Sequence, residues 1–304
     1  MHPTPRVTFD PVAKRKGRNV DPFVGHLDSV ICGDNAEVMA TWPDACIDLV
    51  VTSPPYDDLR KYGGHSWDFP AVARELTRIL KPGGVIVWVV GDATVDGSET
   101  LTSMKQAIHF REVCGLRLHD TMVYASDKPP INSNRYESQW EYIFVLSAGK
   151  PSRWNPIRES CLRVGHLTGK YYRKNGDVKN AHTPGKTKGD KVRGNIWWYA
   201  TGRVGDDRGL HPAMMPEQMA QDMIRTWSNP GDVVLDPFAG SGTTLKMAKE
   251  HGRRWIGIEV NPAYVEICWK RVAQGVLPLV PNAEAHGRRS RTVQPLVGNS
   301  GGEA

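Results

Sequence analysis

A turn with the sequence Thr-Ser-Pro-Pro-Tyr, residues 52–56, follows directly on an apolar run. Its two prolines restrict the backbone and lack N–H groups, so the turn presents acceptors without competing donors. The Ser53 hydroxyl and the Pro54 carbonyl could accept the two N–H bonds of an exocyclic amino group on a planar base. These bonds would draw the nitrogen lone pair out of conjugation and direct it at an electrophile, while Tyr56 stacks on the base. The alternative is a strand-ending turn with a packed tyrosine.

Residues 236–244, Asp-Pro-Phe-Ala-Gly-Ser-Gly-Thr-Thr, form a second turn, here called the glycine turn. Gly240 and Gly242 allow the backbone to approach a ligand, and the helix that follows offers unpaired N–H groups. Glu259 ends the next apolar run, 23 positions after Asp236. A carboxylate at that place can accept both hydroxyls of a ribose. We therefore expect a ligand that contains a nucleoside.

The residues of the glycine turn also indicate which nucleoside is bound. The dinucleotide fingerprint requires a glycine where this chain has Leu245. The acid at Asp236 would repel a pyrophosphate but suits a positively charged amine. S-adenosyl-L-methionine carries an amine, a ribose and a sulfonium, and its methyl group is already activated, so that positioning is the main catalytic need. It is the predicted cofactor; the alternative is a glycine-rich turn without a ligand.

These two turns require a scaffold, and apolar runs alternating with helical periodicity provide one. The periodicity predicts strands at 29–32, 47–52, 85–90, 118–124, 141–146, 233–236 and 255–259. It predicts helices at 69–80, 102–114, 215–227, 243–251 and 262–272. Strands alternating with helices are typical of a layered α/β fold.

Residues 150–193 interrupt this pattern and carry a net charge of +9, more than the +6 of the whole chain. Such a segment could neutralise DNA phosphates. The aromatic residues in or after it could fill the gap left by an extruded base: Trp154, Tyr171, Tyr172, Trp197, Trp198 and Tyr199. The alternative is a solvated, flexible insertion.

The composition excludes several classes of protein. Hydrophobic residues make up 39% of the 304, enough for a sizeable core, and the five cysteines include no C-x-x-C pair. A disulfide framework and a cysteine-rich zinc site are therefore not expected, and no metal is predicted. No apolar run approaches the ~18 residues that span a bilayer, and no secretory signal is visible. We expect a cytoplasmic protein without membrane contact.

Together, the two turns resemble the motifs of the amino-directed DNA methyltransferases, and their order is similar to that of the permuted beta class. The resemblance covers about residues 28–275 and implies a doubly wound, mostly parallel sheet, S-adenosyl-L-methionine as cofactor and double-stranded DNA as partner. By position, the catalytic tetrad is Ser53, Pro54, Pro55 and Tyr56. The positions that match cofactor-binding residues are Asp34, His211, Pro212, Asp236, Phe238, Gly240, Gly242, Thr243 and Glu259.

The resemblance also suggests how the chain is organised. The expected parts are a flexible basic arm (1–25), a catalytic half (26–149), a basic target-recognition insertion (150–210), a cofactor-binding half (211–277) and a disordered tail (278–304). A prokaryotic or phage origin is implied, and a homodimer or a cognate restriction endonuclease are possible partners.

By the same resemblance, serine at the first tetrad position favours N4 of cytosine as the methyl acceptor, because the family's adenine enzymes more often carry Asp or Asn there. N6 of adenine is the alternative. An RNA methyltransferase and a catalytically silent nucleic-acid-binding protein are further alternatives. All of these enzyme hypotheses require that the tetrad and the glycine turn, about 180 positions apart, converge in space. Tyr56 and Gly240 should then lie on the same side of the molecule.

Overall fold

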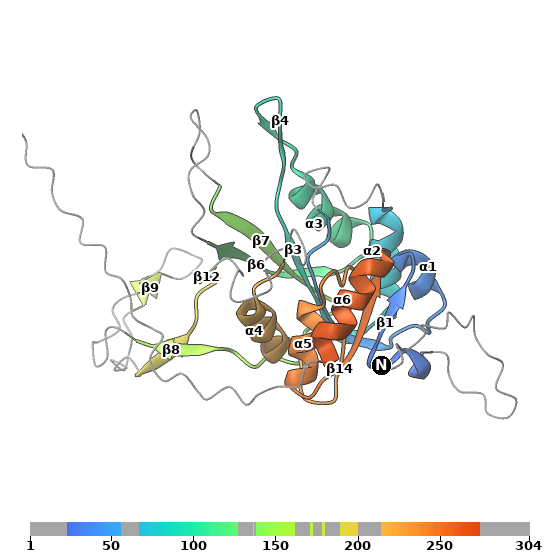
Figure 1. Cartoon of the computed structure of the whole chain (residues 1–304). Coiled ribbons are helices and arrows are strands. Elements are labelled where there is room, and N and C mark those ends of the chain that lie inside the picture. The colour runs from blue at the N-terminus through green and yellow to red at the C-terminus, as the bar shows by residue number, and fades with distance from the viewer. Residues whose placement is uncertain are drawn as a thin grey trace, which may run out of the picture. The chain divides into compact units, whose positions relative to one another are not determined.

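The centre of the fold is an eight-stranded sheet (Figure 1). In the computed structural model its strands lie in the order β1, β14, β13, β2, β3, β7, β6, β12. In that order, their bounds are Ser29–Cys32, Arg254–Glu259, Val233–Asp236, Ile47–Thr52, Leu80–Val90, Trp140–Ser147, Arg117–Ala125 and Ile196–Trp198. The first five are parallel, β7 is antiparallel to both neighbours, and β12 is parallel to β6. The predicted α/β fold with a mostly parallel sheet is confirmed.

The structure describes residues 23–55, 67–126, 136, 138–161, 171–172, 178–179, 189–199 and 214–273. They fall within one unit that ends at Gln274. The predicted tail, nearly all of the predicted arm and much of the predicted insertion lie outside the described residues. Within those residues, no helix has the length and apolar character needed to cross a membrane.

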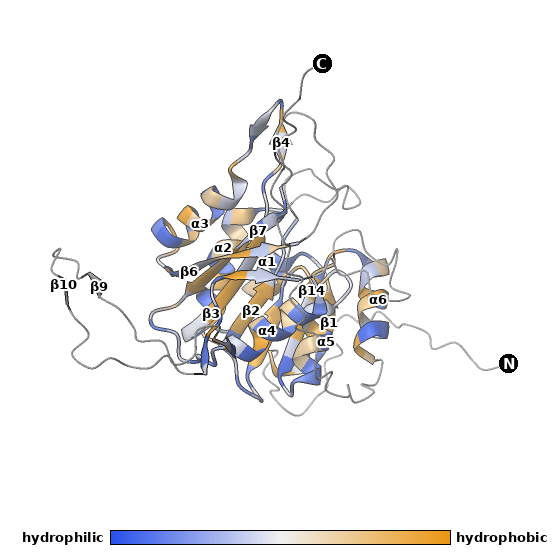
Figure 2. Cartoon of the chain, turned by 90° about the vertical axis from the view of Figure 1, so that its left-hand side faces the viewer, coloured by the Kyte–Doolittle hydropathy of each residue, from blue (hydrophilic) through white to orange (hydrophobic). Residues whose placement is uncertain are grey.

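Helices cover both faces of the sheet, because the strands are apolar on both sides (Figure 2). The helices of one face are α1 Asn35–Ala40, α2 Phe69–Ile79 and α3 Thr102–Glu112. Their core residues include Met39, Leu76 and Phe110. The helices that contribute to the other core are α4 Glu217–Trp227, α5 Thr243–Glu250 and α6 Pro262–Ala273.

The parallel strands place the predicted site. Because β1, β14, β13 and β2 run in the same direction, their carboxyl ends meet at one edge of the sheet. The tetrad begins at the end of β2, the glycine turn connects β13 to α5, and Glu259 ends β14. Ligands of open α/β sheets bind outside such carboxyl ends.

Strand β3 and helix α1 differ from the predictions. Strand β3 begins at Leu80 rather than at Val85, and its pairing with β2 jumps from Leu80 to Val85. Helix α1 was not predicted, because six residues are too few for a periodic pattern. It does carry a local signal, since the Asp34 carboxylate caps it by accepting the Glu37 N–H at 3.0 Å.

The basic segment contains one short antiparallel strand pair and leads into a strand of the main sheet. Strand β8 Arg158–Ser160 pairs with β11 Asp190–Val192 within the segment, and β12, which follows it, joins the main sheet. Two further short hairpins are formed by β4 Thr94–Val95 with β5 Ser98–Glu99, and by β9 Tyr171–Tyr172 with β10 Val178–Lys179.

Two aromatic side chains of this region are packed against the core, which differs from the predicted role of filling the gap left by a base. Trp197 is only 6% exposed and belongs to the core. The Tyr199 hydroxyl donates to the buried Asp222 carboxylate at 2.8 Å. Trp198 is 65% exposed, and Trp154 is 54% exposed although its ring contacts Trp227 with centroids 4.9 Å apart.

Candidate active site

The tetrad strand and the glycine turn are joined directly by hydrogen bonds. The Thr52 hydroxyl donates to Asp236 Oδ1 at 2.7 Å, across 184 positions of sequence. The Thr244 hydroxyl donates to the carbonyl of Val51 at 3.2 Å. These bonds follow from the pairing of β13 with β2. The predicted convergence of the two motifs is present for every tetrad residue that the structure describes; Tyr56 lies outside the described residues.

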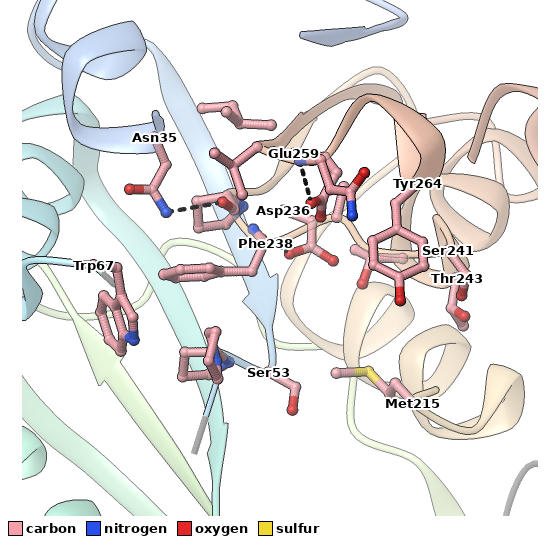
Figure 3. A pocket seen from close by; sticks show the side chains of 18 of the residues that line it. Asn35, Ser53, Trp67, Met215, Asp236, Phe238, Ser241, Thr243, Glu259 and Tyr264 are labelled. Carbon is pink, nitrogen blue, oxygen red and sulfur yellow. Dashed lines mark hydrogen bonds between the residues drawn. The ribbon is translucent and has the colours of Figure 1, made fainter. Parts of the chain in front are cut away.

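One pocket is lined by residues of both motifs (Figure 3). The predicted residues that line it are Asp34, Ser53, Pro54, Pro55, Asp236, Phe238, Thr243 and Glu259. Lining residues that the sequence analysis did not predict include Asn35, Trp67, Met214, Met215, Ser241 and Tyr264. His211 and Pro212, like Tyr56, lie outside the described residues.

Asp236 is a buried carboxylate, 5% exposed, in the wall of this pocket. Its Oδ1 accepts hydrogen bonds from the Thr52 hydroxyl and, at 3.1 Å, from the N–H of Phe238. Burial raises the pKa of Asp236 to about 6, although the bonds from Thr52 and Phe238 favour the charged form. A cation bound in the pocket would therefore stabilise a carboxylate that burial alone disfavours.

Glu259 is held by backbone N–H groups on both oxygens. Oε2 accepts from Gly240 and Oε1 from Asn261, each at 2.9 Å. These bonds fix the carboxylate at the pocket wall. A carboxylate has about four acceptor sites, so each oxygen keeps one for a ligand hydroxyl. The pair of oxygens suits the two neighbouring hydroxyls of a ribose.

A family model described as DNA methylase, of the N6/N4 type, matches residues 47–270 and thus most of the chain. The chain belongs to this DNA methylase family. The match contains the tetrad, the glycine turn and Glu259.

Two curated relatives of the methylase cover most of its chain. It is 44% identical over 243 residues to the orphan methyltransferase M.BamHII of Bacillus amyloliquefaciens, covering 77% of this chain and 91% of the relative. It is 27% identical over 275 residues to the DNA adenine methyltransferase YhdJ of Escherichia coli strain K12, covering 85% of this chain and 87% of the relative.

Solved structures share the fold of the methylase. The PvuII DNA methyltransferase, named as cytosine-N4-specific, superposes with a TM-score of 0.60 at 21% identity, covering 80% of this chain and 85% of that one. TTHA0409 of Thermus thermophilus, solved in complex with S-adenosyl-L-methionine, superposes with a TM-score of 0.53 at 26% identity. The match covers 81% of this chain and 95% of that one. The sheet is therefore that of the methyltransferase fold.

The two glycines of the methylase's glycine turn shape the turn itself. The N–H of Gly240 anchors Glu259, as described above. Gly242 has a φ of +80°, and a Cβ at this position would lie 2.4 Å from the Sγ of Cys268. Gly242 thus allows α5 to begin in close contact with α6. The residues that line the pocket include Ser241 and Thr243 but neither glycine. Direct contact of Gly240 and Gly242 with a ligand stays a prediction.

An aromatic wall closes the other end of the pocket. The rings of Trp67 and Phe238 meet edge to face, with centroids 4.9 Å apart. The Asn35 amide donates to the carbonyl of Pro237 at 3.1 Å, which ties α1 to the glycine turn. The apolar faces suit a planar ring such as adenine. Trp67 was missed in the sequence analysis because it precedes α2 and belongs to no motif.

Arg271 is a second residue that the sequence analysis missed. It lies on α6, is 4% exposed, and binds the glycine turn through the Ser241 carbonyl at 3.0 Å, the Ser241 hydroxyl at 2.8 Å and the Thr243 hydroxyl at 3.1 Å. It also binds Glu217 at 2.9 Å, at the start of α4. Met214 and Met215, just before α4, line the pocket. Arg271 therefore connects two walls of the site without lining it.

We expect Arg271→Ala to lower the free energy of unfolding by about 2 kcal/mol, since buried acceptors would lose their donor. S-adenosyl-L-methionine affinity should fall about tenfold as the turn relaxes. Urea unfolding and calorimetric titration would measure the two effects. Lys270→Ala, at the exposed neighbouring position, is the control and should change neither. A loss of stability with unchanged cofactor affinity would show that Arg271 does not position the turn for the ligand.

Proposed function

We propose that this methylase transfers a methyl group from S-adenosyl-L-methionine to N4 of a cytosine in double-stranded DNA. The observation that carries this proposal is the shared pocket, which the tetrad residues Ser53, Pro54 and Pro55 line together with Asp236 and Glu259. A nucleoside ligand and a base held at Ser53 would then be neighbours.

The side chains of the pocket fit the groups of this cofactor. Glu259 has acceptor capacity for the ribose hydroxyls, and Asp236 would pair with the cationic amine. Trp67 and Phe238 would enclose the adenine. When bound, the cofactor supplies a methyl group activated by the sulfonium. By the family resemblance, His211 and Pro212 would close over the methionine end and Asp34 would lie near the adenine.

The tetrad would orient the acceptor nitrogen. The Ser53 hydroxyl and the Pro54 carbonyl would accept the two N–H bonds of the amino group, which localises the nitrogen lone pair and aims it into the pocket. Tyr56 would stack on the base and hold it out of the helix. Because the donor is already reactive, orientation is the main contribution of these residues.

The alternative acceptor is N6 of adenine, and one relative is named as a DNA adenine methyltransferase. Serine at the first tetrad position favours cytosine. Incubation with DNA and labelled cofactor, followed by nucleoside mass spectrometry, decides the question. We expect N4-methylcytosine; N6-methyladenine would replace the cytosine assignment. Label in RNA alone, or none in either nucleic acid, would overturn the DNA methyltransferase proposal.

Several finer features belong to the same proposal. The tetrad precedes the glycine turn in the chain, which fits the beta class, and residues 150–210 would carry target recognition. The relative at 44% identity is named as an orphan methyltransferase, which favours a solitary enzyme over one paired with a restriction endonuclease. The relatives named above are bacterial, which fits a cytoplasmic enzyme. Sedimentation would test for a homodimer.

Cofactor binding should depend on the charge of Asp236. With its pKa near 6, Asp236 becomes anionic as the pH rises through that value, while an α-amino group keeps its proton up to about pH 8. We expect affinity to increase as pH rises through 6 and to decline above about 8. Thr52→Val removes a bond that favours the charged form and should move the first midpoint upward. Asp236→Asn should abolish the midpoint near pH 6. Calorimetric titration of the cofactor across pH would measure the effect of each variant. An unchanged midpoint in Asp236→Asn would show that Asp236 does not pair with the amine.

A further inference from the structure

Two exposed tryptophans of the main sheet line neither the pocket nor the core. Trp140 is 43% exposed at the start of β7, and Trp198 is 65% exposed at the end of β12. The strand register places both beside the same residue, since Ala125 of β6 pairs with Trp140 on one side and with Trp198 on the other. The two indoles therefore flank a small, buried alanine.

The alternation of side chains puts these three residues on one face of the sheet. Tyr124 and Trp197, their chain neighbours, belong to the core on the α4 side. Ala125 and Trp198 therefore point to the opposite face, as do Trp140 and Tyr142, whose ring packs against the α2–α3 side. Trp140 meets Tyr142 edge to face with centroids 4.6 Å apart, which restrains its ring.

The spacing of the pair suits a flat group. Adjacent strands lie about 4.8 Å apart, so two spacings separate the backbones of Trp140 and Trp198 by roughly 10 Å. A base stacked between two rings needs ring planes roughly 7 Å apart, twice the rise between stacked bases. Side chains that lean toward each other across Ala125 could reach that separation.

The position of the pair links it to the tetrad. Strands β2, β3, β6 and β12 run in the same direction, so the end of β12 and the start of the antiparallel β7 lie at the edge where Ser53 follows β2. Trp140 lies two strands from β2, and Trp198 lies four. Four strand spacings put the backbone of Trp198 roughly 20 Å from that of β2, which corresponds to about six base-pair steps of DNA.

The charges nearby favour contact with bases over contact with phosphates. Burial, together with Asp92 and Glu99, raises the pKa of Tyr142, so negative charge lies beside the Trp140 end. This negative charge would repel DNA phosphates near Trp140, but it would not repel the uncharged face of a base. The segment of net charge +9, which leads into β12, would bind the backbone of the same DNA.

We propose that Trp140 and Trp198 form an aromatic surface that stacks on a base unstacked from the DNA, about six base-pair steps or fewer from the methylated base. The inference rests on the proposed function for its partner. It assigns to Trp198 the role that the sequence suggested for the whole aromatic group, and it adds Trp140, which is not a member of that group.

Alanine at Trp140 or Trp198 should raise the KM for genomic DNA from a methylation-deficient host about tenfold, a usual loss for a stacked base. The kcat and the affinity for S-adenosyl-L-methionine should stay unchanged, and Trp198→Phe should restore most of the loss. The slope of DNA affinity against salt concentration should also stay the same, because no phosphate contact is removed. Fluorescence anisotropy with a labelled single strand of mixed sequence measures binding without methyl transfer.

Trp269→Ala is the matched control, since Trp269 is 41% exposed but packs on Trp255 from α6. It should leave KM and anisotropy at the wild-type values. An unchanged KM for DNA in Trp140→Ala and Trp198→Ala would overturn the proposal, and so would a reduced salt slope. A shift from dimer to monomer in sedimentation, without loss of DNA affinity, would assign the surface to a second copy of the chain. Wild-type protein that binds DNA but transfers no methyl group would instead contradict the proposed function.

Discussion

Ser53→Ala is expected to lower kcat on the order of 100-fold, the usual scale for loss of a group that acts on the reacting atoms. The hydroxyl lies in the wall shared with Asp236 and Glu259 and would accept one N–H bond of the acceptor amine. Without it, the nitrogen lone pair stays conjugated with the ring and points less well at the methyl donor. Affinity for S-adenosyl-L-methionine should change by no more than about twofold, since the cofactor would bind to other side chains.

Single-turnover methyl transfer and calorimetric titration measure the two quantities separately. Ser98→Ala, in the exposed β4–β5 hairpin, is the control and should behave as wild type. Tyr56→Ala should follow Ser53→Ala, whereas Tyr56→Phe keeps the stacking ring and should retain most activity. Equal losses of turnover and cofactor affinity in Ser53→Ala would contradict a role in orienting the base.

Gly242→Ala is expected to lower the free energy of unfolding by about 3 kcal/mol. Part of this cost is the φ of +80°, which side-chain-bearing residues rarely adopt. The rest is steric, because the new Cβ would lie 2.4 Å from Cys268 Sγ and 3.3 Å from the Cα and Cβ of the same residue. Helices α5 and α6 would have to separate, and the glycine turn would move with them. Urea unfolding measures the loss.

Gly97→Ala is a close control, because Gly97 has the same φ of +80°, but a Cβ there would meet nothing beyond its chain neighbours within 4 Å. It should lose about 1 kcal/mol, the backbone cost alone. Cys268→Ala in the Gly242→Ala background should restore part of the difference by removing the Sγ, while the Cα and Cβ contacts remain. Equal losses in Gly242→Ala and Gly97→Ala would mean that the packing against Cys268 costs nothing.

Most elements were predictable because their signals are local. Strand β13 has the predicted bounds, Val233–Asp236, and helix α5 begins at the predicted residue, Thr243. Apolar alternation, proline and glycine act within a few residues, so they can be read along the chain. Strand β12 has only three residues and follows a segment without periodicity, so only its pairing with β6 identifies it as part of the sheet.

The sequence by itself predicted the chemistry of this protein from a proline-rigid acceptor turn, a glycine turn and two acids, whose types and local spacing indicate what each would bind. The tertiary structure decided which of these groups meet. It placed the Thr52 hydroxyl on Asp236, the Gly240 N–H on Glu259, and Arg271 on Ser241. Such contacts depend on the order of strands β14, β13 and β2 and on how α6 packs beside α5. Hydrophobic periodicity requires that each element bury one face, but it does not specify which neighbour covers that face.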